Sequence, residues 1–201
     1  MKSKTFNDLI IMSLIGSVFS FLSCLNKNSS EDKYLNIPVY KYLTVEIIDS
    51  LPDENFLLII NNQLQRKLPE DYKKEFEIVM SWNKSQQAIY MIWWLEAEVN
   101  NGGFNQFYEN SSGQYAEYLP DALRLIGAVK FADLVERANK VYLENYEQIT
   151  KEIDGTLEGF SKSYEDNPLN EFDAEFYKYE EPLYDLQVKY IKAHKQDFID
   201  K

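Results

Sequence analysis

Large hydrophobic residues recur at three- and four-residue steps along almost the whole chain from Tyr40 onward. This spacing places them on one face of an α-helix, whereas strict alternation would place them on one face of a β-strand. The sequence shows no stretch of strand-like alternation, and its seven glycines and six prolines are few for a turn-rich β architecture. The pattern therefore predicts an all-α fold, formed as a single compact domain of about six to eight helices.

Proline and acidic residues mark where several helices begin. Pro52-Asp53-Glu54 and Pro69-Glu70-Asp71 each combine a residue that fits the first helical turn with carboxylates that favour the positive end of the helix dipole. Further helices are predicted over residues 85–99, 119–126, 131–142 and 169–198. The last of these is expected to kink or restart near Pro182, and the glycine-containing segment 151–168 is expected to be a loop.

The most hydrophobic helix, over residues 85–99, runs into an element of unusual composition. Its sequence is Glu98-Val-Asn-Asn-Gly-Gly-Phe-Asn-Gln-Phe-Tyr-Glu-Asn-Ser-Ser-Gly113. The asparagines tolerate left-handed backbone, and Gly102 or Gly103 can take the positive φ that ends many helices. The aromatic residues that follow are spaced for a short helix, and residues 110–113 favour turns. We expect a helix, a tight turn, a short aromatic helix, a second tight turn and another helix.

The residues of this motif element (residues 98–113) leave two interpretations open. Its amide side chains can bond to backbone groups exposed at the two helix breaks, which would make the element a scaffold. The same amides can instead bind a ligand or a partner. The residues on which both interpretations rest are Glu98, Asn100, Asn101, Gly102, Gly103, Phe104, Gln106, Phe107, Asn110, Ser111 and Gly113.

The motif element, followed by Ala122-Leu123 and Ile126-Gly127-Ala128, resembles the signature of the DNA-mimic protein family, which is bacterial. The resemblance covers roughly residues 65–150, and the acidic C-terminal end more loosely. It implies an all-α domain. In the family's studied member, a dimer displays carboxylates like the phosphates of duplex DNA and occupies the DNA-binding face of a transcription factor. The resemblance therefore implies a basic protein partner, such as a DNA-binding protein, and a homodimer.

The chain is strongly acidic, with 33 acidic and 21 basic residues and a net charge of −12. Such a surface repels nucleic acid and attracts basic partners, so direct binding to nucleic acid is not expected. Residues 144–185, the acidic segment, hold thirteen acidic residues against three lysines, a net charge of −10. We predict a partner-binding surface here; the alternative is a solvated face that only keeps the protein soluble. The predicted contact residues are Glu144, Glu147, Glu165, Asp166, Glu171, Asp173, Glu175, Glu180, Glu181 and Asp185.

The first residues are typical of an export signal. Lys2 and Lys4 precede an apolar stretch of fourteen residues, Leu9 to Leu22, which suits the core of a signal peptide better than a membrane span. Ser23 then precedes Cys24, the only cysteine of the chain. This arrangement resembles a bacterial lipoprotein signal, in which the cysteine is lipidated and becomes the new N-terminus.

The expected organisation therefore places the protein at a membrane of the cell envelope. Its predicted parts are a signal peptide over 1–23, a flexible tether over 24–39 and the all-α domain over 40–201. A lipid anchor on Cys24 would hold the domain outside the cytoplasm, where it cannot meet a transcription factor. The alternative function is that of an envelope lipoprotein with a ligand-binding or structural role, whose acidity only gives solubility. If the leader is not a true signal, the protein is cytoplasmic.

The sequence offers few residues for catalysis or metal binding. His194 and Cys24 are the only histidine and cysteine, so neither a zinc set nor a Ser-His-Asp arrangement is indicated. Glu96 and Glu98 are the best carboxylates for acid–base work, but residues two apart on a helix point to different faces. A hydrolase would require a concave pocket around Asn100–Asn110 with a buried Glu98. We expect a protein that is not an enzyme and has no cofactor or metal.

Overall fold

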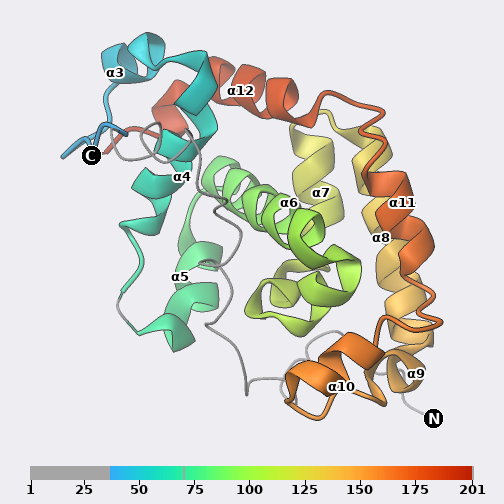
Figure 1. The fold of residues 1–201 in the computed structure, drawn as a ribbon. Coiled ribbons are helices and arrows are strands. Elements are labelled where there is room, and N and C mark those ends of the chain that lie inside the picture. The colour runs from blue at the N-terminus through green and yellow to red at the C-terminus, as the bar shows by residue number, and fades with distance from the viewer. Residues whose placement is uncertain (1–36, 70, 201) are drawn as a thin grey trace, which may run out of the picture. The chain divides into compact units, whose positions relative to one another are not determined.

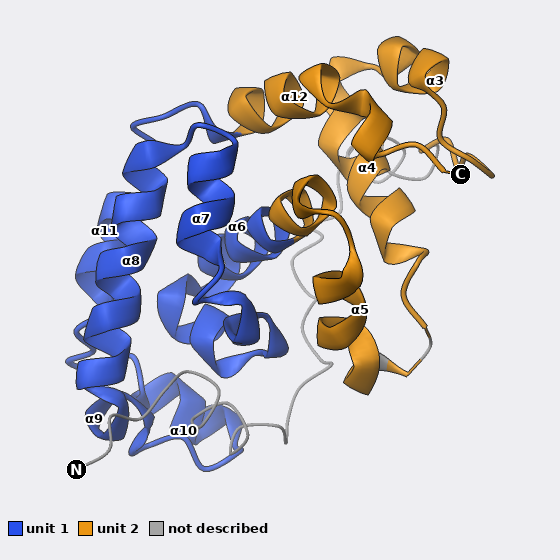
Figure 2. Ribbon diagram, turned by 180° about the vertical axis from the view of Figure 1, so that it is seen from behind, with its two compact units in different colours: residues 1–16, 91–183 blue, residues 17–90, 184–201 orange. Residues whose placement is uncertain are grey.

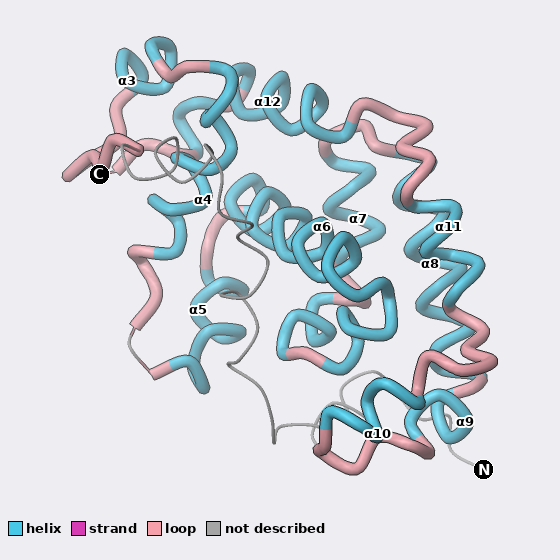
Figure 3. Tube along the Cα trace, viewed as in Figure 1, coloured by secondary structure: helices cyan, strands magenta, loops and turns pink. Residues whose placement is uncertain are grey.

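The computed structural model describes residues 37–69 and 71–200, and every regular element within these ranges is helical (Figure 1, Figure 3). The all-α prediction is confirmed. The predicted signal peptide, Cys24 and the tether as far as residue 36 lie outside the described residues. Within the described ranges, no helix is both long enough and apolar enough to cross a membrane.

The described residues form ten α-helices. In chain order these are α3 (Val45–Ser50), α4 (Phe56–Gln65), α5 (Glu75–Ser81), α6 (Lys84–Glu109), α7 (Leu119–Leu125), α8 (Val129–Glu144), α9 (Tyr146–Thr150), α10 (Leu157–Lys162), α11 (Asn170–Phe176) and α12 (Leu183–Ala193). Short 3-10 turns lie at Asp53–Asn55, Tyr72–Lys74, Ser111–Tyr115 and Lys195–Asp197. There are more α-helices than the six to eight expected, because the region after α8 is divided into several short ones.

The C-terminal region agrees with the prediction in one place and differs from it in another. The expected helix over 169–198 consists of α11 and α12, separated by a linker, and Pro182 directly precedes α12 as its restart signal. The expected loop over 151–168 contains α10, so that prediction was wrong. The helix forms despite Gly155 and Gly159 because Thr156 caps its start: the Thr156 side-chain oxygen accepts the N–H of Gly159 at 3.0 Å.

Contacts group the described residues into two units, each with its own core (Figure 2). Of the described chain, the first unit holds residues 91–183 and the second holds residues 37–90, without residue 70, and 184–200. In the first unit α7 packs against α8, and α11 packs against the same helix. Fully buried side chains at its centre are Phe104, Phe107, Leu123, Val135 and Phe176.

The second unit brings together the two ends of the described chain. The Asp200 carboxylate accepts the backbone N–H of Leu43 at 2.7 Å and the side-chain amide of Gln63 at 3.0 Å. Phe56, Ile60 and Leu64 of α4 fill the core of this unit. The motif element and all but the last residue of the acidic segment's predicted contact set belong to the first unit, which therefore holds the candidate site.

Candidate functional site

The motif element folds around a break in the middle of α6. Gly102 (φ −152°, ψ 28°) and Gly103 (φ 69°, ψ −175°) leave the helical conformation, so two helical stretches meet at a kink. The second stretch ends at Glu109, and Asn110 is extended before the 3-10 turn that follows. The predicted order of helix, turn, short aromatic helix and turn is confirmed.

The side chain of Asp173, a residue of α11, lies against the kink in α6. Its Oδ1 accepts the N–H of Phe104, the first residue after the break, at 2.7 Å. This carboxylate caps the new helical stretch as a side chain from another element, where the sequence alone suggested a local cap. A Cβ atom on Gly103 would lie 2.3 Å from Asp173 Oδ2, so only glycine fits between the backbone and the carboxylate. Burial raises the pKa of Asp173, partly offset by the hydrogen bond from Phe104.

Two tyrosines satisfy the carbonyl groups that the kink exposes. Tyr177 donates its hydroxyl to the Val99 carbonyl at 2.7 Å, and Tyr164 donates to the Gly102 carbonyl at 2.8 Å. Burial raises the pKa of Tyr164 to about 12, so its hydroxyl keeps its proton and remains a donor at neutral pH. The helix end is therefore satisfied by side chains from the acidic segment.

Glu98 connects the two breaks of the motif element. Its side chain is buried, and its Oε2 accepts the amides of Gln106 at 2.6 Å and Asn110 at 2.7 Å. Asn101 completes this network by donating to Gln106 Oε1 at 2.9 Å. The amides predicted either to scaffold or to bind are thus largely engaged with one another, which favours the scaffold interpretation.

Asn105 extends the scaffold through residues that sequence reasoning missed. It donates to Ser163 Oγ at 2.7 Å and accepts the amide of Asn167 at 3.1 Å, and all three residues are buried. Asn167 in turn accepts the N–H of Leu169 at 2.9 Å. Ser163 and Asn167 lie in the segment expected to be a loop, so no periodic signal marked them as partners of the motif.

The aromatic residues of the motif element point into the core. Phe104 and Phe107 are fully buried, and the Phe104 ring meets the Phe176 ring edge-on with centroids 5.9 Å apart. Tyr108 stacks on Tyr142 at 4.1 Å and donates to Asn139 at 2.8 Å, and burial raises the pKa of both tyrosines. These contacts fix the aromatic stretch as part of the packed interior.

Two surface hollows lie away from the motif element. Two hollows of about 350 Å³ are present in the described structure: one beside α4, and one between α9 and the segment around Asn167. No residue of 98–113 lines either of them. Although Glu98 is buried, the pocket around Asn100–Asn110 that a hydrolase would require is not among these two.

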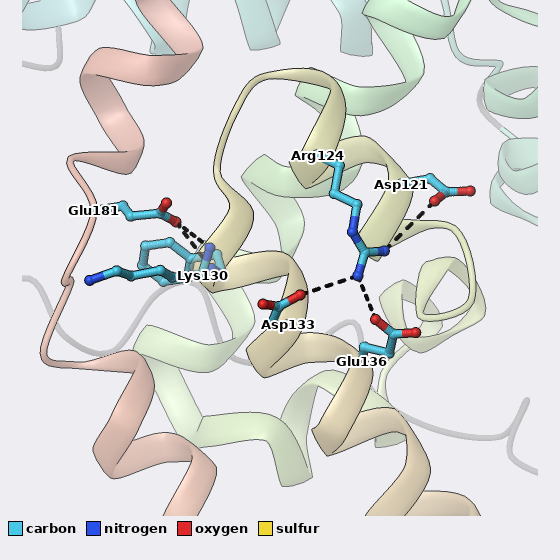
Figure 4. Close-up of polar contacts among 7 residues, drawn as sticks. Asp121, Arg124, Lys130, Asp133, Glu136 and Glu181 are labelled. Carbon is cyan, nitrogen blue, oxygen red and sulfur yellow. Dashed lines mark hydrogen bonds and ion pairs between the residues drawn. The ribbon is translucent and has the colours of Figure 1, made fainter.

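The acidic segment divides into acids that hold the fold and acids that face solvent. Asp173 caps the kink, and Glu181 accepts the N–H groups of Lys130 at 2.9 Å and Phe131 at 3.1 Å, at the start of α8 (Figure 4). Glu175 pairs with Arg137, and Glu180 pairs with Lys130 at 3.0 Å. The remaining predicted contact residues, all exposed, are Glu144, Glu147, Glu165, Asp166, Glu171 and Asp185.

A second group of carboxylates, which the sequence analysis did not single out, lies on α7 and α8. Arg124 faces Asp121, Asp133 and Glu136, with its guanidinium 3.2 Å from Asp133 and 2.5 Å from Glu136 (Figure 4). The hydrogen bond that Arg124 donates to Glu136, together with the nearby negative charge, raises the pKa of Arg124. Three carboxylates around one guanidinium leave this corner net negative. The three-residue spacing of Asp121 and Arg124 on α7, and of Asp133 and Glu136 on α8, is the sequence signal that could have indicated it.

Comparison with known proteins identifies the region that carries the site. A family model described as DMP19-like protein matches residues 80–194 of the chain. The matched region contains α6 to α12, and with them the motif element and the whole acidic segment. No curated protein and no solved structure matches the chain.

Replacing Gly103 should test the geometry of the kink. Gly103→Ala forces a Cβ into the Asp173 carboxylate at a positive φ, so we expect the free energy of unfolding to fall by about 2–4 kcal/mol. Urea denaturation followed by circular dichroism measures this change. Gly155→Ala is the matched control, because Gly155 also has a positive φ (82°) but no atom within 4 Å of the added Cβ. The control should lose only about 1 kcal/mol, and equal losses in the two variants would contradict the close contact.

Titration of Asp173 should make stability depend on pH in the acid range. Because its pKa is raised above the ordinary 3.8 in the folded state, this group favours folding at low pH. That contribution is lost as the pH rises through the raised pKa. Relative to Asp173→Asn, whose side-chain oxygen still accepts the Phe104 N–H, the unchanged protein should therefore lose stability between about pH 4 and neutral pH. A stability difference that is constant with pH, or that changes with the opposite sign, would rule this out.

Proposed function

This chain belongs to the DMP19-like protein family, and on that premise we propose that it is a non-enzymatic acidic module that binds a basic protein partner. The observation that carries the proposal is the set of exposed carboxylates in the acidic segment, which lies wholly within the region that the family model matches. We further propose that these carboxylates take the place of DNA phosphates, so that the fitting partner is a protein that itself binds DNA.

The charges of three exposed acids are available to a partner. Glu165, Asp166 and Glu171 are exposed, and within the described chain their carboxylates form no ion pair or hydrogen bond. An exposed ion pair contributes only about 0.2–1 kcal/mol, so useful affinity requires several of them at once. A partner that carries several basic residues close together meets this requirement, and its binding weakens as salt screens the charges.

The packed motif element supports the same proposal. Its buried aromatic rings and mutually bonded amides hold α6 and α11 in place, and the acidic segment is attached to this support through Asp173 and Tyr177. Charges carried on a firmly held backbone cost less conformational entropy on binding than the same charges on a flexible tail, which favours recognition by charge arrangement.

Neutralising the exposed acids should weaken binding to a basic probe. The triple variant Glu165→Gln, Asp166→Asn and Glu171→Gln keeps side-chain size and removes three negative charges; asparagine also tolerates the positive φ of Asp166 (52°). We expect its affinity for a fluorescent octa-lysine peptide at low salt to fall about tenfold. Fluorescence anisotropy measures the affinity, and the effect should shrink as salt is added.

A second triple variant separates local from total charge. Asp71→Asn, Glu77→Gln and Glu117→Gln also replace three exposed acids, but none of them lies in the acidic segment. The control should lose about twofold in affinity or less, which is the share expected from net charge alone. Equal losses in the two triple variants would remove the acidic segment as the binding surface.

We also propose that Cys24 determines where the module is displayed. If the leader is a lipoprotein signal, cells that express the full chain should incorporate labelled palmitate into it and hold it in the membrane fraction. The Cys24→Ala variant should take up no label. If the wild-type chain is soluble and unlabelled, it carries no lipid anchor. The partner of the acidic module would then be a cytoplasmic protein.

A further inference from the structure

The linker between α11 and α12, Tyr177–Pro182, is exposed over most of its length and carries two surface tyrosines. Tyr177 is 50% exposed and Tyr179 is 36% exposed, so part of each ring meets solvent. Both belong to the first unit, beside the motif element. Partly exposed tyrosine rings combine apolar area with a polar hydroxyl, which suits them to contacts with a partner.

Hydrogen bonds hold both rings in fixed positions. Tyr177 donates to the Val99 carbonyl at 2.7 Å. Tyr179 donates to Glu96 Oε1 at 3.2 Å and accepts the amide of Asn100 at 3.0 Å. Because each hydroxyl is anchored to α6, neither ring can turn freely, and the linker presents preformed aromatic surface.

The linker backbone is held as firmly as its side chains. Tyr179 has a positive φ of 44°, a conformation that a bulky residue rarely adopts unless its surroundings impose it. The Tyr179 ring packs against Phe131 and Phe176 with centroid distances of 5.4 and 5.3 Å. Glu180, the next residue, pairs with the side chain of Lys130. Glu181 accepts the backbone N–H of Lys130 (Figure 4). The linker is thus tied to α6 on one side and to α8 on the other.

The charges beside the rings select the kind of side chain that fits. Glu96 accepts from Tyr179, and Glu180 and Glu181 follow Tyr179 in the chain, so three carboxylates lie near the aromatic surface. Two lysines lie there as well, Lys178 in the linker and Lys130, which pairs with Glu180 at 3.0 Å, so the local charge is net negative by one. A guanidinium is planar, stacks on aromatic rings and bonds to a carboxylate through two N–H groups. An ammonium can meet the carboxylate, but it is more strongly hydrated and gains less from the rings.

Two other occupants fit less well. Nucleic acid bases also stack on tyrosine, but their phosphates would be repelled by a chain of net charge −12. A second copy of this chain would bring the same carboxylates against one another. An arginine-bearing partner satisfies both the rings and the charge.

We propose that the linker Tyr177–Pro182, with Glu96 of α6, is a docking surface for arginine side chains of a basic partner protein. This inference rests on the proposed function and adds to it a position on the fold and a preference for arginine over lysine. The exposed acids of the acidic segment attract any basic chain, and the tyrosines discriminate between the two basic side chains.

The test compares two labelled peptides of equal charge, octa-arginine and octa-lysine, on the full chain by fluorescence anisotropy. The wild-type protein should bind octa-arginine more tightly by about threefold to tenfold, the range that surface cation–π contacts supply. The variant Tyr179→Leu, which leaves the hydrogen bond from Tyr177 to the kink in place, should lose most of this preference while keeping its octa-lysine affinity within about twofold. Tyr42→Leu is the matched control, because Tyr42 is 57% exposed in the second unit, and it should keep the preference.

A second measurement does not depend on the folding of the leucine variant. Nitration of wild-type tyrosines by tetranitromethane, mapped by mass spectrometry, should slow at Tyr177 and Tyr179 when octa-arginine is bound and should be unchanged at Tyr42. Equal affinity for the two peptides, a preference that survives in the leucine variant, or nitration that octa-arginine leaves unchanged would each overturn the inference. If neither peptide binds at all, the proposed function itself fails. If octa-lysine binds as well as octa-arginine, only the docking of arginine fails.

Discussion

The hydrogen bond from the Phe104 N–H to the Asp173 carboxylate, 2.7 Å long, joins the two most distinctive parts of the sequence. Breaking α6 after Gly102 turns Phe104 and Phe107 into the core, but it also exposes backbone groups that must find partners. Asp173 supplies the acceptor on one side of the break, and Tyr164 and Tyr177 supply the donors on the other. The motif and the acidic segment are therefore one structural feature, because neither end of the break is satisfied without the segment.

The acidic segment consequently has two roles that its net charge alone would not distinguish. Asp173 and Glu181 face helix N–H groups and hold α6, α8 and α11 together, while Glu165, Asp166 and Glu171 remain at the surface. Removing the acceptor oxygens of the first group should cost stability, and neutralising the second group should cost binding. The inward-facing carboxylates also give the exposed ones a rigid support, which a solvated tail of the same charge would not have.

The sequence predicted local structure well, but it did not predict which residues far apart in the chain contact each other. Hydrophobic spacing placed α4, α7 and α8, and the glycine pair placed the kink, because both signals are read within one or two helical turns. The caps of the kink could not be predicted in the same way. Asp173 lies 69 positions from Phe104, so no local pattern connects them. The same holds for Ser163 and Asn167, which lie far from Asn105 in the chain. The helix α10 was missed because a single threonine cap starts it between two glycines.

The resemblance to the DNA-mimic protein family agrees with the DMP19-like match over residues 80–194, and it supported the fold more firmly than it identified a partner.

We propose that the acidic segment, and not overall charge, recognises a basic protein. An NMR titration of the isotope-labelled full chain with an arginine-rich peptide tests this most directly, because it reports on every assigned backbone amide separately. The predicted result is that shift changes concentrate at residues 165–181 and at the kink of α6 near Asn100, and that they vanish at high salt. Shift changes spread evenly over the exposed acids of both units, or confined to residues 37–90, would contradict the claim.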